Sequence, residues 1–173
     1  MSDAPAASAN PSAAAREAQA WAVLNELPDP EIPVLSIVDL GIVRYVRATE
    51  AGLCVGLTPT YSGCPATEII RGQVRAALAA HGFADARLEE VLSPPWSSAW
   101  LSAAGRAKLR AFGIAPPEEP VTSVRALWQS PQVRCPRCAS ASTERVSEFG
   151  STPCKAHYRC RNCGEPFDYF KCL

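Results

Sequence analysis

The chain has 173 residues, which leaves room for one ordinary domain and a small second module but not for three domains. Hydrophobic residues make up 47% of it and charged residues 20%, as in ordinary globular proteins, so global disorder is excluded. Lys and Arg together number 17, and so do Asp and Glu, so no long-range field attracts nucleic acid or an anionic membrane. The sequence shows no signal-peptide pattern and no apolar stretch long enough to span a membrane, so we expect a cytoplasmic protein.

The first third of the chain predicts a tail, a helix, a loop and a hairpin. Residues 1–12 are rich in Ala, Ser and Pro and predict a disordered tail. Apolar residues at helical spacing predict a helix over 13–27, and the proline-broken segment 29–41 predicts a structured loop. Alternating apolar residues then predict two strands, 42–49 and 53–58, joined by a short turn.

A second helix and a third strand complete this domain. Apolar residues at helical spacing run from Ala66 to His81, and Gly82 is the expected C-terminal cap. Residues 87–92 predict a less regular strand. The order α-β-β-α-β predicts an α+β fold with the helices on one face of a small sheet.

The remaining residues divide into an exit from this domain, a linker and a second module. A short helix is expected near 102–112, and a Pro-rich stretch follows it. We therefore place the first domain at residues 13–120, the linker at 121–129 and the second module at 130–173.

The second module carries the most specific motif of the chain. Two C-x-x-C pairs, Cys135 with Cys138 and Cys160 with Cys163, are separated by twenty-one residues. Four thiolates presented by two tight turns complete a tetrahedron around zinc, and iron in the same four-sulfur site is the alternative. Two strands are expected between the pairs, over 140–147 and 154–159, and a third over 167–171. The module is therefore predicted to be a three-stranded zinc ribbon whose folding depends on its metal.

Two further cysteines and the charge of the module leave choices open. Cys154 and Cys172 lie outside the pairs and are either small apolar fillers or partners of one another. If Cys160 pairs with residue 166 across antiparallel strands, Cys154 lies opposite Cys172. Residues 130–173 carry seven Lys or Arg and four Asp or Glu, and metal-bound thiolates offset part of that excess, so nucleic-acid binding is disfavoured.

A second candidate site lies on two loops of the first domain. Cys64 precedes Pro65 at the expected start of a helix, where an anion such as a thiolate is favoured, although a buried packing cysteine is the alternative. Several hydroxyl groups lie nearby in the sequence, on Thr58, Thr60, Tyr61 and Ser62. Asp29 and Glu31 on the preceding loop, together with Asp39, could supply hard oxygen ligands or an acid or base group, although loop carboxylates usually cap backbone amides.

The residues around these loops carry a family resemblance. The blocks DPEIPVLSIVDLGIV (29–43) and TPTYSGCPATEI (58–69) resemble iron–sulfur assembly and targeting factors of the SufT type. Further along, SPPWSSAWLSAAGRAKL, CPRC, EFGSTPCKAHYRC and EPFDYFKC are similar to the D subunits of bacterial phenylacetyl-CoA epoxidases. The resemblance extends from about residue 20 to the end of the chain.

This resemblance implies an accessory subunit in aerobic phenylacetate degradation, a pathway of aromatic degradation, that assists assembly of an iron–sulfur or di-iron centre. The oxygenase and reductase subunits of the epoxidase would be its partners, with no nucleic acid or membrane among them. Family motif positions carried over onto this chain are Asp29, Glu31, Thr58, Thr60 and Cys64, which would hold iron or a cluster transiently.

The residues also argue that the chain is not itself an enzyme. A di-iron oxygenase needs Glu-x-x-His units, and this sequence has none. It also lacks the glycine-rich motifs of a nucleotide-dependent reductase. A purely structural subunit is the alternative to a maturation factor, and a nucleic-acid-binding regulator is a weaker one.

Overall fold

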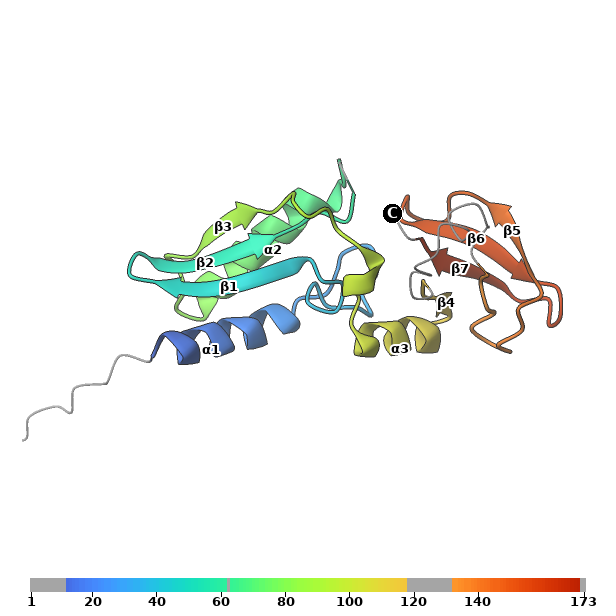
Figure 1. The fold of residues 1–173 in the computed structure, drawn as a ribbon, viewed down its shortest axis with the longest axis horizontal. Coiled ribbons are helices and arrows are strands. Elements are labelled where there is room, and N and C mark those ends of the chain that lie inside the picture. The colour runs from blue at the N-terminus through green and yellow to red at the C-terminus, as the bar shows by residue number, and fades with distance from the viewer. Residues whose placement is uncertain (1–11, 62, 118–131, 172–173) are drawn as a thin grey trace, which may run out of the picture.

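The structure is a computed structural model that describes residues 12–61, 63–117 and 132–171. The expected disordered tail, except for Ser12, and the expected linker at 121–129 lie outside these described residues. Two modules, each with its own sheet, make up the rest of the chain (Figure 1).

The first module is a three-stranded sheet with two helices. Strands β1 (Val43–Thr49) and β2 (Gly52–Leu57) form an antiparallel hairpin, and β3 (Arg87–Glu90) pairs parallel with β2. Helix α1 (Ala13–Asn25) contacts both β1 and α2 (Ala66–Ala80), and Figure 1 shows both helices running along the sheet. The predicted α+β fold with the order α-β-β-α-β is confirmed.

The local sequence explains where α1 begins and which face each of the two helices buries. The side chain of Ser12 accepts a hydrogen bond from the Ala15 amide and caps α1, whose Val23 and Leu24 point into the core. Helix α2 buries Ile70, Val74 and Leu78 at the spacing of one helical face.

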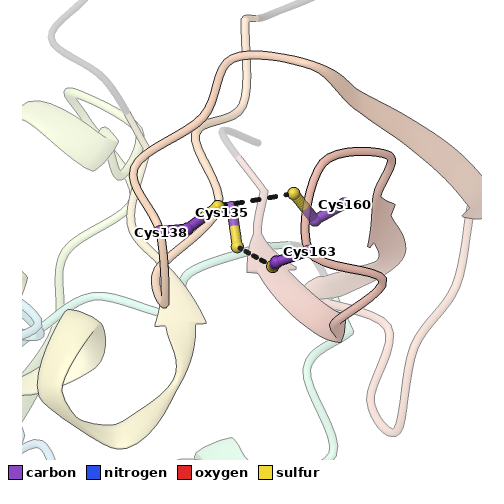
Figure 2. Close-up of side chains that lie close together, drawn as sticks. All are labelled: Cys135, Cys138, Cys160 and Cys163. Atoms are coloured by element: carbon purple, nitrogen blue, oxygen red, sulfur yellow. Dashed lines mark hydrogen bonds between the residues drawn. The ribbon is translucent and has the colours of Figure 1, made fainter.

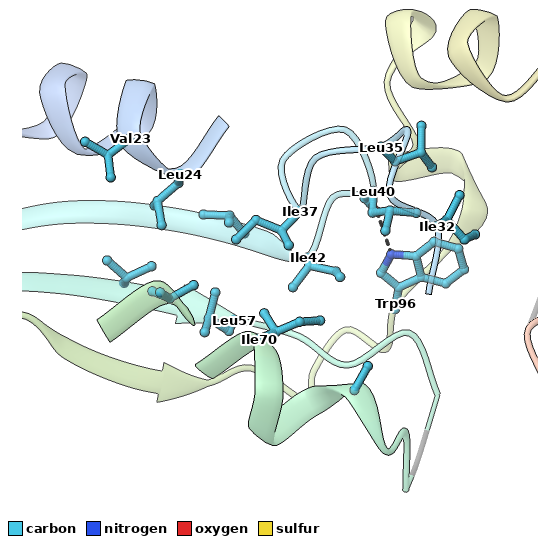
Figure 3. Close-up of a cluster of buried hydrophobic side chains, with 14 of the residues drawn as sticks. Val23, Leu24, Ile32, Leu35, Ile37, Leu40, Ile42, Leu57, Ile70 and Trp96 are labelled. Atoms are coloured by element: carbon cyan, nitrogen blue, oxygen red, sulfur yellow. Dashed lines mark hydrogen bonds between the residues drawn. The ribbon is translucent and has the colours of Figure 1, made fainter. Parts of the chain in front are cut away.

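The loop between α1 and β1 belongs to the core despite its prolines. Four of its apolar side chains, Ile32, Leu35, Ile37 and Leu40, are at most 2% exposed. Figure 3 shows them continuing the apolar layer formed by the helices and the sheet, with the indole of Trp96 donating to the carbonyl of Leu40 at 2.9 Å. This burial holds the loop in place at one end of the sheet.

Three short elements lead from the first sheet to the second. A 3₁₀ turn, η1 (Ser98–Trp100), precedes α3 (Ala103–Phe112), which ends at Gly113 in the left-handed conformation. Strand β4 (Ile114–Ala115) follows directly. It pairs parallel with a strand of the second module, a pairing that the sequence pattern did not predict.

The second module is a ribbon of β5 (Thr143–Ser147), β6 (Lys155–Cys160) and β7 (Pro166–Phe170). These are the three expected strands, and β4 adds a fourth, giving the order β4-β7-β6-β5. We call this module the ribbon.

The register of β6 and β7 corrects one expectation. Arg159, rather than Cys160, pairs with Pro166, because the turn after Cys160 closes through a hydrogen bond from the Cys160 amide to the carbonyl of Glu165. At the other end of the pair the amide of Lys171 donates to the carbonyl of Cys154 at 2.9 Å. The expected opposition of Cys154 and Cys172 rested on the wrong register, and Cys172 lies outside the described residues.

The hydrophobic core of the first module extends to two residues of the ribbon, which also has a buried cluster of its own. Phe170 and Cys154 belong to the ribbon, yet both are buried in the apolar cluster of the first module. The ring of Phe170 packs edge-on against Trp96 with centroids 6.0 Å apart. The ribbon is therefore packed against the first module rather than tethered beside it.

In the part of the chain that the structure describes, no helix combines the length and the apolar character that crossing a membrane requires.

Candidate functional site

The four paired cysteines of the ribbon converge on one point. The Sγ atoms of Cys135, Cys138, Cys160 and Cys163 all lie within 4.8 Å of one another. Figure 2 shows the two pairs facing each other, with 3.8 Å between the sulfurs of Cys135 and Cys163 and 3.6 Å between those of Cys138 and Cys160. The convergence expected from the spacing is confirmed.

Two similar turns produce this arrangement. In the first, the amide of Ala139 donates to the carbonyl of Cys135, and Ala139 has φ of 58°. In the second, the amide of Gly164 donates to the carbonyl of Cys160, and Gly164 has φ of 78°. A left-handed residue four positions after the first cysteine therefore closes each turn and aims both of its thiols to the same side.

The surroundings of the thiols suit a bound cation. Cys135 and Cys160 are buried, whereas Cys138 and Cys163 are exposed. A hydrogen bond from the Ser140 amide is the main cause that lowers the pKa of the Cys138 thiol to about 7. Four thiols at this spacing fit the tetrahedral all-sulfur coordination of zinc, with the metal screening the thiolates from one another.

A separate pocket lies where the first module meets the ribbon. The five residues expected to form the loop site all line it: Asp29, Glu31, Thr58, Thr60 and Cys64. The buried loop supplies the two carboxylates, the end of β2 supplies Thr58, and the segment before α2 supplies Cys64. The ribbon contributes further walls, Cys154 and Phe170.

Asp29 braces the loop. Its Oδ1 atom accepts hydrogen bonds from the amides of Glu31 at 3.0 Å and Ile32 at 2.8 Å. Burial raises the pKa of the Asp29 carboxyl, although these two amide bonds act in the opposite direction. This contact is the capping role left open for a loop carboxylate, and it fixes the backbone that carries Glu31.

Glu31 instead points toward the ribbon. The Sγ atom of Cys154 donates to Oε2 of Glu31 at 3.2 Å and lies 3.0 Å from the hydroxyl of Thr152. Burial raises the pKa of the Cys154 thiol to about 12, so the group is a protonated donor. The contact joins residues 123 positions apart in the sequence.

Tyr61 lies beside the same thiols. Its hydroxyl is buried and has no hydrogen-bond partner among the described residues. Burial is the main cause that raises the pKa of Tyr61 to about 12, and the nearby Cys64, Glu31 and Cys154 act in the same direction. A buried hydroxyl without a partner is costly, so this one is a candidate to contact something held in the pocket.

Asp39, considered with the loop carboxylates as a possible ligand, does not line this pocket. Its carboxylate accepts from the hydroxyl of Ser102 at 2.7 Å and from the ammonium group of Lys108 at 2.6 Å. Burial alone would raise the pKa of Asp39, but these hydrogen bonds outweigh it and lower the pKa below the ordinary value. Asp39 therefore fastens α3 to the loop.

The ribbon side of the pocket was missed by reasoning from the sequence. Local patterns made Cys154 only a filler or a partner of Cys172, and Tyr61 only one of several nearby hydroxyl residues. The charged residues Arg71 and Glu90 also line the pocket without any motif to indicate it. The block EFGSTPC carried a signal, a cysteine outside the paired spacing, but its contact depends on how the modules pack.

Comparisons with known proteins match both modules. The family model "Iron-sulfur cluster assembly protein" matches residues 17–86, and "PaaD zinc beta ribbon domain" matches residues 119–171. An Escherichia coli K12 protein named as the putative D subunit of 1,2-phenylacetyl-CoA epoxidase is 51% identical over 153 residues, which cover 88% of this chain and 91% of that protein. The chain belongs to this family of D subunits. We call its first module the assembly domain from here on.

Two further relatives match about half of the chain. The Bacillus subtilis protein named "Fe-S protein maturation auxiliary factor YitW" is 40% identical over 76 residues, or 43% of this chain and 74% of that protein. A solved structure of a domain of unknown function, DUF59, from Bacillus anthracis has a TM-score of 0.52 and 30% identity, covering 56% of this chain and 93% of its own. Each of these relatives matches only part of the chain, whereas the Escherichia coli protein matches most of it.

Proposed function

We propose that this protein is an accessory maturation subunit of a multicomponent phenylacetyl-CoA epoxidase. In this proposal the pocket at Cys64 holds iron or an iron–sulfur cluster transiently as cargo and passes it to a client subunit. The ribbon holds a structural zinc ion at Cys135, Cys138, Cys160 and Cys163, with iron as the alternative metal. The oxygenase and reductase subunits are the proposed partners.

The pocket is the observation that carries this proposal. It combines the Cys64 thiol with the half-buried carboxylate of Glu31 and the hydroxyls of Thr58 and Thr60. A thiol beside a carboxylate is a donor set that accepts iron, which tolerates both sulfur and oxygen ligands. Most of the residues that line this pocket lie in the region matched by an iron–sulfur cluster assembly family.

The donor groups support an accessory role rather than oxidation chemistry. The sequence holds two histidines and no Glu-x-x-His unit, so it lacks the ligand pattern of the ferritin-like di-iron carboxylate proteins. Zinc in the ribbon would have no redox chemistry, and four protein sulfurs leave it no open position for substrate. Its contribution would be to the folding of the ribbon.

The test is replacement of Cys64 by serine, with Cys54→Ser as the matched control. Cys54 lies on β2 in the same domain, is also half-buried and does not line the pocket. Each variant is coexpressed with the other epoxidase subunits, and iron per purified oxygenase subunit is measured by mass spectrometry. We expect Cys64→Ser to lower this iron content while the abundance of the subunits stays unchanged, and Cys54→Ser to match the wild type.

The second candidate function is a purely structural subunit, favoured by the packing of Phe170 and Cys154 into the core of the assembly domain. In that case Cys64 is a packing residue. Full iron occupancy in the Cys64→Ser strain would reject maturation and favour this alternative. Loss of the other subunits from the complex on deletion of the protein would then be its signature.

A further inference from the structure

The position of Cys154 has no explanation in the ribbon itself. It stands immediately before β6 and is 3% exposed. Cys154 is not part of the tetracysteine cluster. Among the described residues, that cluster is the one group of three or more metal-ligating side chains with all ligand atoms within 4.8 Å of one another. Its side chain packs instead into the assembly domain.

One of the two polar contacts of the Cys154 side chain is with a residue that lines the pocket. Its thiol donates to Glu31, a residue of the candidate iron site, at 3.2 Å. Both Cys154 and Cys64 line this pocket, although they come from different modules. A cysteine serving only as an apolar filler has no need of a carboxylate partner.

A second observation points to a ligand between these groups. The buried hydroxyl of Tyr61 has no partner among the described residues, and it lies within electrostatic reach of Cys64, Glu31 and Cys154. Tyr61 does not itself line the pocket, but a metal ion bound between the two thiols would lie near its hydroxyl. Two thiols and one carboxylate thus line the same space, and this hydroxyl lies close to them.

We propose that Cys154 is the second sulfur ligand of the cargo site, so that iron is held between Cys64 of the assembly domain and Cys154 of the ribbon, with Glu31 beside them. This inference rests on the proposed function and adds a ligand from the ribbon. As the metal–sulfur bond forms, the S–H bond of Cys154 breaks and Glu31 accepts the proton, so no oxidation occurs. Among the described residues, the ligand atoms of Glu31, Cys64 and Cys154 do not all lie within 4.8 Å of one another, unlike those of the ribbon.

The experiment uses the zinc-loaded full-length protein, titrated with Co²⁺ in the absence of oxygen. Zinc binds such sites more tightly than cobalt, so the ribbon keeps its zinc and cobalt reports on the pocket. Thiolate-to-cobalt charge-transfer absorption measures binding, and X-ray absorption at the cobalt edge counts sulfur neighbours. We expect two sulfur neighbours in the wild type.

The variants separate the roles of the two thiols. Cys154→Ser and Cys64→Ser should each leave cobalt with one sulfur neighbour. Loss of a residue that only hydrogen-bonds to a metal ligand weakens metal binding by roughly 10- to 100-fold, so loss of a ligand itself should weaken cobalt binding by at least that factor. Glu31→Gln, which keeps an acceptor for Cys154, should weaken binding without changing the sulfur count. Cys54→Ser should match the wild type.

The outcomes distinguish this inference from the proposed function. If Cys64→Ser removes a sulfur neighbour and Cys154→Ser does not, the inference is wrong and the proposed function stands. If neither variant alters cobalt binding, both are wrong. If Cys154→Ser loses its zinc or its fold, the sulfur count of the wild type decides: two sulfurs support the inference and one overturns it.

Discussion

Replacement of Phe170 by alanine tests whether the ribbon and the assembly domain unfold as one unit. Phe170 belongs to β7 of the ribbon, yet its ring is 2% exposed and lies in the core of the assembly domain against Trp96. The substitution removes this ring while leaving the tetracysteine cluster untouched. It therefore weakens the packing between modules rather than the metal site.

The expected loss of stability follows from the burial. Truncation of a fully buried phenylalanine costs about 3–5 kcal/mol through lost transfer energy and the cavity left behind. The edge-on contact with Trp96, at 6.0 Å between centroids, supplies about 0.5–1.5 kcal/mol of that. The matched control is Phe112→Ala, because Phe112 is 62% exposed and its truncation should change stability by no more than about 0.5 kcal/mol.

The assay is urea unfolding of the zinc-loaded protein, followed by tryptophan fluorescence and by zinc release to a chromogenic chelator. In the wild type we expect the two signals to change together, as one cooperative transition. In Phe170→Ala the fluorescence transition should move to lower urea while zinc release separates from it. A Phe170→Ala protein that unfolds like Phe112→Ala, with both signals still coincident, would refute the shared core.

Three further predictions concern single contacts. Cys135→Ser should reduce bound zinc from one equivalent to nearly none and make the ribbon sensitive to protease, because folding of the ribbon is coupled to metal binding. Metal analysis and limited proteolysis measure the two effects, and retained zinc would contradict the prediction. The pKa of Asp39 is lowered below its ordinary value of 3.8, so its bond to Lys108 stabilises the fold above about pH 4 and is lost as the pH falls through the lowered pKa. Lys108→Met should therefore cost about 1 kcal/mol at neutral pH and progressively less below pH 4 in urea titrations, whereas a pH-independent difference would exclude this origin. Gly41 has φ of 69°, and a Cβ added there would lie 2.7 Å from the Cβ atom of Trp100. Gly41→Ala should therefore lower the free energy of unfolding by roughly 2–4 kcal/mol. An unchanged Tm would argue against this close approach.

Features set by short sequence spacing were predictable from the sequence. The two C-x-x-C pairs fix two tight turns, and a site shared by four thiols is the arrangement that suits them, so the convergence on one point follows from local geometry. The helix at Ala66–Ala80 follows from its apolar spacing. Asp29, Glu31 and Cys64 could be placed together because their loops flank the same hairpin.

The β6–β7 register marks the limit of such reasoning. Alternation identifies both strands, but the pairing depends on the turn between them, where the bond from the Cys160 amide to the carbonyl of Glu165 shifts the partners by one residue. The two-residue strand β4 has no pattern of its own that could reveal it. It forms because Ile114 and Ala115 pair with the edge of β7 that does not pair with β6.

The ribbon wall of the pocket was decided by tertiary structure alone. Nothing near Cys154 in the sequence indicates Glu31 as its partner, since the two residues are 123 positions apart and meet where the ribbon packs against the assembly domain. Local sequence patterns determine which residues form turns, helices and strands, because conformational preferences act over a few residues. The contact between two modules depends on the complementary shapes of their buried surfaces. The sequence by itself therefore determined the elements of each module, whereas the tertiary structure decided the pocket that the two modules form together.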